Sequence, residues 1–147
     1  MAVSEEIDLR RLYWVGPVTV GAAVIAVMVC QKITGALVPP MSKFSESILH
    51  SNKPAVFTAV LVSGAVIIFP MFVEMASNPL RTFRRMSLVV MLISCAPNLY
   101  AALARKAGVE WGMLALMVMH VVAWAVTVPM LTRLTVATAE PRRTETP

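Results

Sequence analysis

The chain has 147 residues, of which 58% are hydrophobic and 14% are charged, a balance far more apolar than that of soluble domains. This composition excludes an ordinary water-soluble fold and indicates a single-domain membrane protein whose first partner is the lipid bilayer. The net charge of +5 lies in short Lys and Arg clusters at the ends of apolar runs rather than along one face, which argues against nucleic-acid binding.

Four apolar runs are long enough to cross a hydrocarbon core, which takes about 20 helical residues. The continuous apolar character of these runs argues against a β-barrel. The sequence therefore predicts an all-α fold, an integral membrane bundle of four transmembrane helices in up-down-up-down order, at residues 13–33, 55–75, 87–103 and 111–131.

The segments outside these helices are predicted to be polar connections. Residues 1–12 form a cytoplasmic leader, 34–54 an outer loop and 132–147 a disordered cytoplasmic tail around one domain, 13–131. Eight basic residues fall on the side of the two termini and five on the other, which favours a bacterial plasma membrane with both termini in the cytoplasm.

The outer loop leaves two interpretations open for residues 41–52. Met41, Phe44, Ile48 and Leu49 share one face at helical spacing, which is typical of a short amphipathic helix on the membrane surface. An irregular loop with scattered apolar residues is the alternative. The double proline Pro39–Pro40 ends the preceding helix in either case.

The second apolar run carries small residues at four-residue steps, Ala55, Ala59 and Ser63. Such a stripe lets another helix approach closely in lipid, so it predicts a helix-packing face. That face is the candidate contact for a homo-oligomer or for a membrane protein partner.

Glu74 is the one acidic residue inside an apolar run, and it lies at the predicted cytoplasmic end. The arginines that follow make an interfacial ion pair a better interpretation than a transport site. The candidate partners are Arg81, Arg84 and Arg85.

His120 lies near the predicted bilayer midplane, where polar groups are costly and often functional. Asn98, Ser94 and Ser63 fall at broadly comparable depth, so the four residues are a candidate polar cluster. The imidazole is either a proton-accepting or ligand-binding group or a neutral side chain that donates to a carbonyl or to Asn98. The second interpretation is favoured because no buried carboxylate accompanies the histidine.

No cofactor, metal site or catalytic residue is expected. Cys30 and Cys95 have no metal-ligand spacing and are predicted to be free thiols. Haem is not expected, because the second histidine, His50, lies in the outer loop. The sequence also lacks a phosphate-binding glycine loop and a nucleophile motif.

The closing run "ALMVMHVVAWAVTVPMLTRL" resembles the last helix of an uncharacterised bacterial family of small four-helix membrane proteins, a domain of unknown function. The resemblance covers most of residues 10–134 and is strongest at Met119 and His120, followed by Pro129. It implies a fold but no activity.

These features predict an integral membrane protein without its own catalysis, which acts through helix packing as an accessory subunit or homo-oligomer. The alternative is a small transporter or ligand-binding bundle that uses His120 and Asn98.

Overall fold

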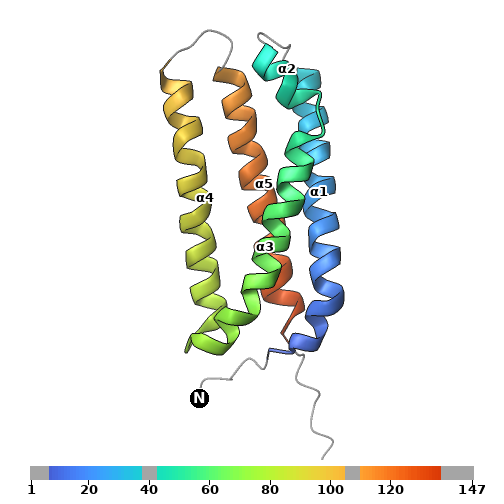
Figure 1. The fold of residues 1–147 in the computed structure, drawn as a ribbon, viewed down its shortest axis with the longest axis vertical. Coiled ribbons are helices and arrows are strands. Elements are labelled where there is room, and N and C mark those ends of the chain that lie inside the picture. Colours follow the sequence, from blue (N-terminus) through green and yellow to red (C-terminus); the bar gives the residue numbers. More distant parts are fainter. Residues whose placement is uncertain (1–6, 38–42, 105–109, 137–147) are drawn as a thin grey trace, which may run out of the picture.

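The computed structural model describes residues 7–37, 43–104 and 110–136, which form one short 3-10 helix and five α-helices (Figure 1). Apolar composition over long stretches explains why helix prevails, because a helix satisfies its main-chain hydrogen bonds internally. The elements are η1 (Leu9–Arg11), α1 (Leu12–Leu37), α2 (Lys43–Leu49), α3 (Lys53–Met75), α4 (Pro79–Leu103) and α5 (Glu110–Leu134).

The four long helices run side by side along the long axis of the molecule, and α2 lies across one end (Figure 1). The helix α5 packs against both α1 and α4, while α3 packs mainly against α1. Two ends can be defined. The arginine end holds η1, the turn 76–78 and the end of α5, and the α2 end is the opposite one.

Three helical segments are long and apolar enough to cross a membrane, as expected for a multi-pass membrane protein. They are Leu9–Leu37, Lys53–Met75 and Trp111–Leu134. The fourth predicted span, 87–103, lies within α4, which begins about two turns earlier at Pro79. The all-α prediction is confirmed, while the fourth crossing stays a prediction.

Several predicted boundaries differ from the observed ones. The helix α1 continues to Leu37, into the predicted outer loop, and α5 continues to Leu134, into the predicted tail. Both extensions are polar or mixed in composition and are still helical, because hydropathy marks where lipid begins rather than where a helix stops. Residues 1–6 of the predicted leader and 137–147 of the predicted tail lie outside the described residues.

The core divides into two clusters at different heights. The cluster at the arginine end joins α1, α3, α4 and α5 through Val15, Phe69, Phe83, Val128 and Leu131. Phe69 and Phe83 meet edge to face, with ring centroids 4.9 Å apart and an interplanar angle of 87°.

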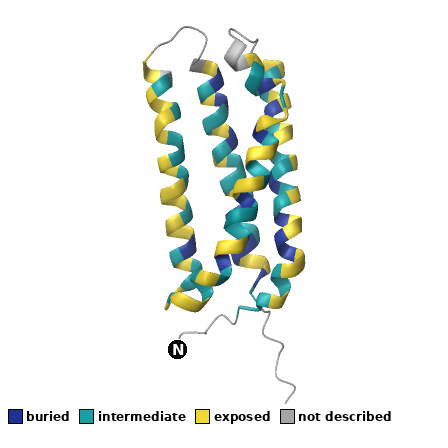
Figure 2. Ribbon diagram, viewed as in Figure 1, coloured by how far each residue is buried: buried dark blue, intermediate teal, exposed yellow. Residues whose placement is uncertain are grey.

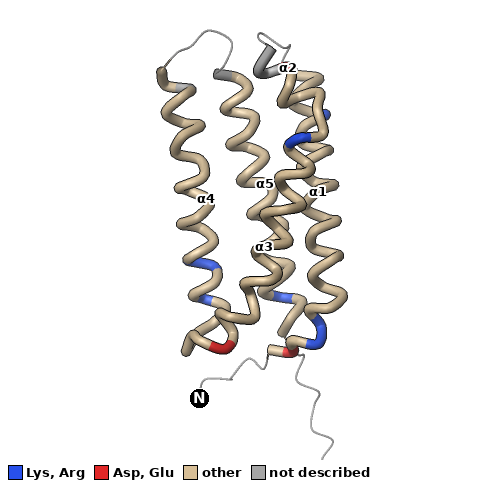
Figure 3. The backbone as a smooth tube through the Cα atoms, in the orientation of Figure 1, with Lys and Arg blue, Asp and Glu red and all other residues tan. Residues whose placement is uncertain are grey.

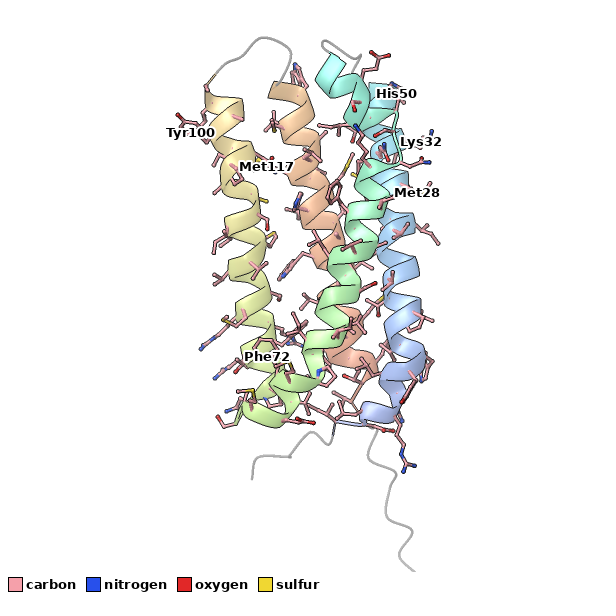
Figure 4. The ribbon with its side chains drawn as sticks, viewed as in Figure 1. Met28, Lys32, His50, Phe72, Tyr100 and Met117 are labelled. Carbon is pink, nitrogen blue, oxygen red and sulfur yellow. The ribbon has the colours of Figure 1, made fainter. Side chains whose placement is uncertain are left out.

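The second cluster, at the α2 end, is built from α1, α2 and α5 alone. Its buried members are Val27, Leu49, Ala115 and Met119. Neither cluster includes a residue from the half of α4 nearer the α2 end. Figure 2 shows exposed residues along the length of that helix. Tyr100, near the end of α4, is 77% exposed and points away from the other helices (Figure 4).

The segment for which the sequence left two interpretations open is helical over Lys43–Leu49. Leu49 is only 2% exposed and packs into the second core cluster. The buried Gln31 of α1 donates from Nε2 to the carbonyls of Ile48 and Ser51, each at 2.7 Å. Because the last carbonyls of a helix lack partners within it, this one amide group fixes the end of α2 to α1.

The two ends of the described chain meet at the arginine end. Ile7 and Val136 form an antiparallel bridge, and the Asp8 amide donates to the Thr135 carbonyl at 2.9 Å. Arg11 Nη1 donates to the Val136 carbonyl at 3.2 Å. We call these contacts the terminal clasp.

The helices α1 and α3 lie close together at Gly16. A Cβ atom built on Gly16 would lie 2.8 Å from Cγ1 of Val66, whereas one on Gly21 would meet nothing within 4 Å. A small residue at such a crossing lets two helix backbones approach, which strengthens packing in lipid.

We therefore expect Gly16→Ala to destabilise the bundle by about 1–3 kcal/mol through overpacking. Gly21→Ala is the matched control in the same helix, and it should leave stability unchanged or raise it by about 1 kcal/mol through helix propensity. Thermal unfolding followed by circular dichroism in one detergent measures both. Equal stability of the two variants would contradict the close crossing, and Gly16→Ala combined with Val66→Ala should recover part of the loss.

Candidate functional site

The first turns of α4 and the last turns of α5 are antiparallel neighbours at the arginine end. Sequence places two adjacent arginines directly before the apolar part of α4 and one after the apolar part of α5. Antiparallel packing brings these charges to the same height, where basic residues gather in Figure 3. The three residues are Arg84, Arg85 and Arg133.

Arg84 is held across the helix pair by a threonine. Its Nε and Nη2 atoms donate to Oγ1 of Thr132 at 3.3 and 3.0 Å. The Thr132 hydroxyl in turn donates to the Val128 carbonyl at 2.8 Å, and the residue is 1% exposed. The hydroxyl is therefore fully used, and its position fixes the orientation of the guanidinium.

A second hydrogen-bonded link lies one turn further along α4. Trp124 Nε1 donates to Oγ of Ser87 at 3.2 Å, and that hydroxyl donates to the Arg84 carbonyl at 3.0 Å. The indole is thus fixed against α4 with its nitrogen satisfied. Two polar links, rather than apolar contacts alone, set the register of α4 on α5.

These residues border a cavity of about 380 Å³ between α4 and α5. Charged groups lie at one end of it, and an apolar wall continues toward the middle of the two helices. Such a lining can take an anionic group with an attached apolar part. The lining residues are Arg84, Arg85, Leu88, Trp124, Val128, Pro129, Thr132 and Arg133.

A second cavity, of about 360 Å³, lies at the opposite end of the molecule and is lined by Glu46, Ser47, His50 and Ser51. Its lining comes from α2 and the residues just after it. Lys53 Nζ donates to Ser47 Oγ at 3.2 Å nearby. Figure 4 labels His50 and Lys32 at this end of the molecule.

The model of a family of unknown function, DUF6069, matches residues 7–137. The chain belongs to this family. Among curated proteins and among solved structures, none matches it. The prediction of an uncharacterised family is confirmed, and the three apolar helices support its membrane character.

In this DUF6069 member His120 and Asn98, two residues of the predicted polar cluster, each bond to a main-chain carbonyl of their own helix. His120 Nδ1 lies 2.7 Å from the carbonyl of Leu116, one turn earlier in α5. Asn98 Nδ2 donates to the Ser94 carbonyl at 3.4 Å within α4. Among the described residues this bond within α4 is the only one between members of the set, and neither His120 nor Ser63 bonds to another member, so a shared cluster stays a prediction.

The predicted ion pair of Glu74 stays a prediction. Glu74 is exposed, and within the described part of the chain it forms no ion pair. Arg84 turns across to Thr132 instead, and Arg81 and Arg85 remain exposed. A charge in contact with water has little to gain from pairing, which explains why the fold does not enforce it.

The predicted packing face, Ala55, Ala59 and Ser63, is half-buried. It lies beside the buried Val62 on α3, near the crossing of Val66 with Gly16. The helix α1 therefore covers part of this face.

Sequence reasoning missed the bond of Arg84 to Thr132 and the bond of Trp124 to Ser87. A usable signal was present, since Trp124, Val128 and Thr132 recur at four-residue steps and mark one face of α5. The predicted site was chosen by depth in the membrane. This criterion selects His120 and does not select residues at the membrane boundary.

Proposed function

We propose that this chain is a four-span membrane protein without its own catalysis, with both termini in the cytoplasm of a bacterial cell. It acts through helix packing, as an accessory subunit or as a homo-oligomer. The terminal clasp is the observation that supports this arrangement most strongly.

The clasp favours an even number of crossings. Ile7 and Val136 pair directly, so the two ends of the described chain lie on the same side of any membrane that the bundle crosses. Three crossings would separate these ends. The helix α4 is the remaining long helix, so it is the fourth span of the proposal.

The composition of α4 is compatible with crossing. Residues 86–103 contain no Lys, Arg, Asp or Glu. At about 1.5 Å per residue this segment measures about 27 Å, close to the thickness of a hydrocarbon core. Its exposed apolar side chains, which include Leu92, Ile93 and Leu103, suit contact with lipid or with another helix.

The distribution of charge supports the orientation. The arginine end carries six of the described basic residues and the α2 end carries Lys32, Lys43 and Lys53. Basic residues are retained on the cytoplasmic side during insertion. The six are Arg10, Arg11, Arg81, Arg84, Arg85 and Arg133.

Single-cysteine labelling tests the fourth span. In a chain with Cys30 and Cys95 changed to Ala, we expect Ala104→Cys to react with a membrane-impermeant maleimide on intact cells. Asn78→Cys, at the other end of α4, should react only after permeabilisation. Labelling of both cysteines from the same side would rule out a crossing by α4.

Association through α3 is the second element of the proposal. The small residues Ala55, Ala59 and Ser63 are half-buried, so one helix from another chain can extend a contact that α1 begins. Exposed apolar residues on α3, such as Val60 and Leu61, are matched equally well by lipid and give no preference for protein.

We expect Ala59→Leu to reduce crosslinked oligomers in native membranes, because the larger side chain separates the helices. Val60→Leu, a change to the same residue at an exposed neighbouring position, is the control and should have no effect. Thermal unfolding of each purified variant reports packing inside the monomer. Unchanged oligomer populations, or a loss of monomer stability that accounts for the whole change, would contradict association through this face.

One observation favours a second candidate, a transporter or ligand-binding bundle that uses His120. The bond between Nδ1 and the Leu116 carbonyl requires the hydrogen on Nδ1, which leaves Nε2 as a basic acceptor. The imidazole is half-buried at mid-helix.

His120→Leu separates the two candidates. The helical amide of residue 120 still serves the Leu116 carbonyl, so the fold and the oligomer populations should remain unchanged if the histidine is structural. Proton flux into protein-containing vesicles, measured across a series of external pH values, should also be unchanged. Loss of a pH-dependent flux with intact folding would favour the transporter.

A further inference from the structure

The cavity between α4 and α5 joins two unlike surfaces in one place. Arg84, Arg85 and Arg133 border one end, and Leu88 and Val128 continue the wall toward the apolar parts of both helices. Arg85 immediately precedes the uncharged segment 86–103, and Arg133 follows the apolar run of α5. The change from charged to apolar lining therefore coincides with the membrane boundary of the proposed function.

The hydrogen bonds from Arg84 to Thr132 leave one edge of the guanidinium group available to an anion. Thr132 Oγ1 accepts from Nε and Nη2, which form the side edge of the guanidinium. The end edge, formed by Nη1 and Nη2, keeps a pair of N–H donors, and such a pair matches two oxygens of a phosphate. A guanidinium that is already oriented loses little side-chain freedom on binding an anion.

The hydrogen bond between Trp124 and Ser87 likewise fixes one side chain of the apolar wall. The indole of Trp124 is fixed by Ser87 and lies in the lining about nine residues, or roughly 14 Å, from Arg133 along α5. This separation places an aromatic face at the depth of acyl chains when the arginines are at the headgroups.

We infer that the cavity between α4 and α5 binds an anionic phospholipid, with its phosphate on Arg84, Arg85 and Arg133 and an acyl chain along Leu88, Trp124 and Val128. Basic pockets between membrane helices on the cytoplasmic side suit such headgroups. The apolar wall distinguishes a lipid from free inorganic phosphate, which shares only the anionic group. The inference rests on the proposed placement of the arginine end at the cytoplasmic membrane surface.

Trp124 gives a direct readout of occupancy. The chain has three tryptophans, and Trp14→Phe with Trp111→Phe leaves Trp124 as the only one. The full chain is reconstituted in phosphatidylcholine nanodiscs that contain a fixed minority of lipid brominated on its acyl chains, either phosphatidylglycerol or phosphatidylcholine. We expect brominated phosphatidylglycerol to quench Trp124 more strongly at equal mole fraction.

The charge variants test the proposed contacts. In the single-tryptophan chain, Arg84→Gln or Arg85→Gln should each lower the preference for phosphatidylglycerol about fivefold, because one surface arginine contributes about that factor toward an anionic lipid. Arg10→Gln removes the same charge from the same end of the bundle but lies outside the cavity, so the preference should persist.

A third variant tests whether Thr132 positions Arg84. Thr132→Val keeps every charge and removes the hydroxyl, so it should reduce the preference, and Thr132→Ser should restore it. Circular dichroism of each variant verifies that the helices remain. An unchanged preference in Thr132→Val would mean that the free guanidinium suffices, which overturns the oriented site.

The remaining outcomes separate the possible failures. Equal quenching by the two brominated lipids overturns the anionic site while leaving the membrane placement intact. Quenching by neither lipid overturns the proposed membrane placement and the lipid site with it. Loss of quenching on addition of sodium phosphate, but not of sodium chloride at equal ionic strength, would identify free phosphate as the ligand and overturn the lipid assignment.

Discussion

Several hydroxyl and amide side chains of this bundle are satisfied within their own helix, because a membrane span must supply its own hydrogen-bond partners. Lipid offers no hydrogen bonds, so a hydroxyl or amide in a span must find a protein partner. In Thr34, Thr58, Thr132, Thr135 and Asn98 the side chain donates to the carbonyl four residues earlier. A side chain that bonds within its own helix does not determine which helices pack together.

Helix pairing is consequently decided by shape in most of the molecule and by polar links in one place. Gly16 against Val66 and Phe69 against Phe83 are contacts of size and aromatic geometry. The links from Arg84 to Thr132 and from Trp124 to Ser87 are the hydrogen bonds between long helices that fix α4 on α5. Two buried hydroxyls, of Thr19 in α1 and Thr127 in α5, have no hydrogen-bond partner in the described structure, which costs stability.

The sequence predicted the helices well because composition alone carries that information. The all-α fold follows from long apolar runs, and the same-side position of the chain ends agrees with the clasp of Ile7 and Val136. The site was harder to predict, because Thr132 and Arg84 are 48 positions apart and their contact depends on helix rotation. The contact of Gln31 with the end of α2 was missed for a similar reason. Its partners are main-chain carbonyls, which every residue type has, so the sequence does not distinguish them. Depth in the membrane directed attention to His120, whose Nδ1 contact lies within its own helix.

The terminal clasp also has a meaning for how the molecule is made. Arg11 and Val136 are separated by 125 positions, so their bond cannot form until residue 136 has been synthesised. Because α5 packs against α1, the first helix is also made long before one of its main packing partners. The closing of the two chain ends upon each other therefore belongs to the last part of synthesis, after α1, α3 and α4 are complete.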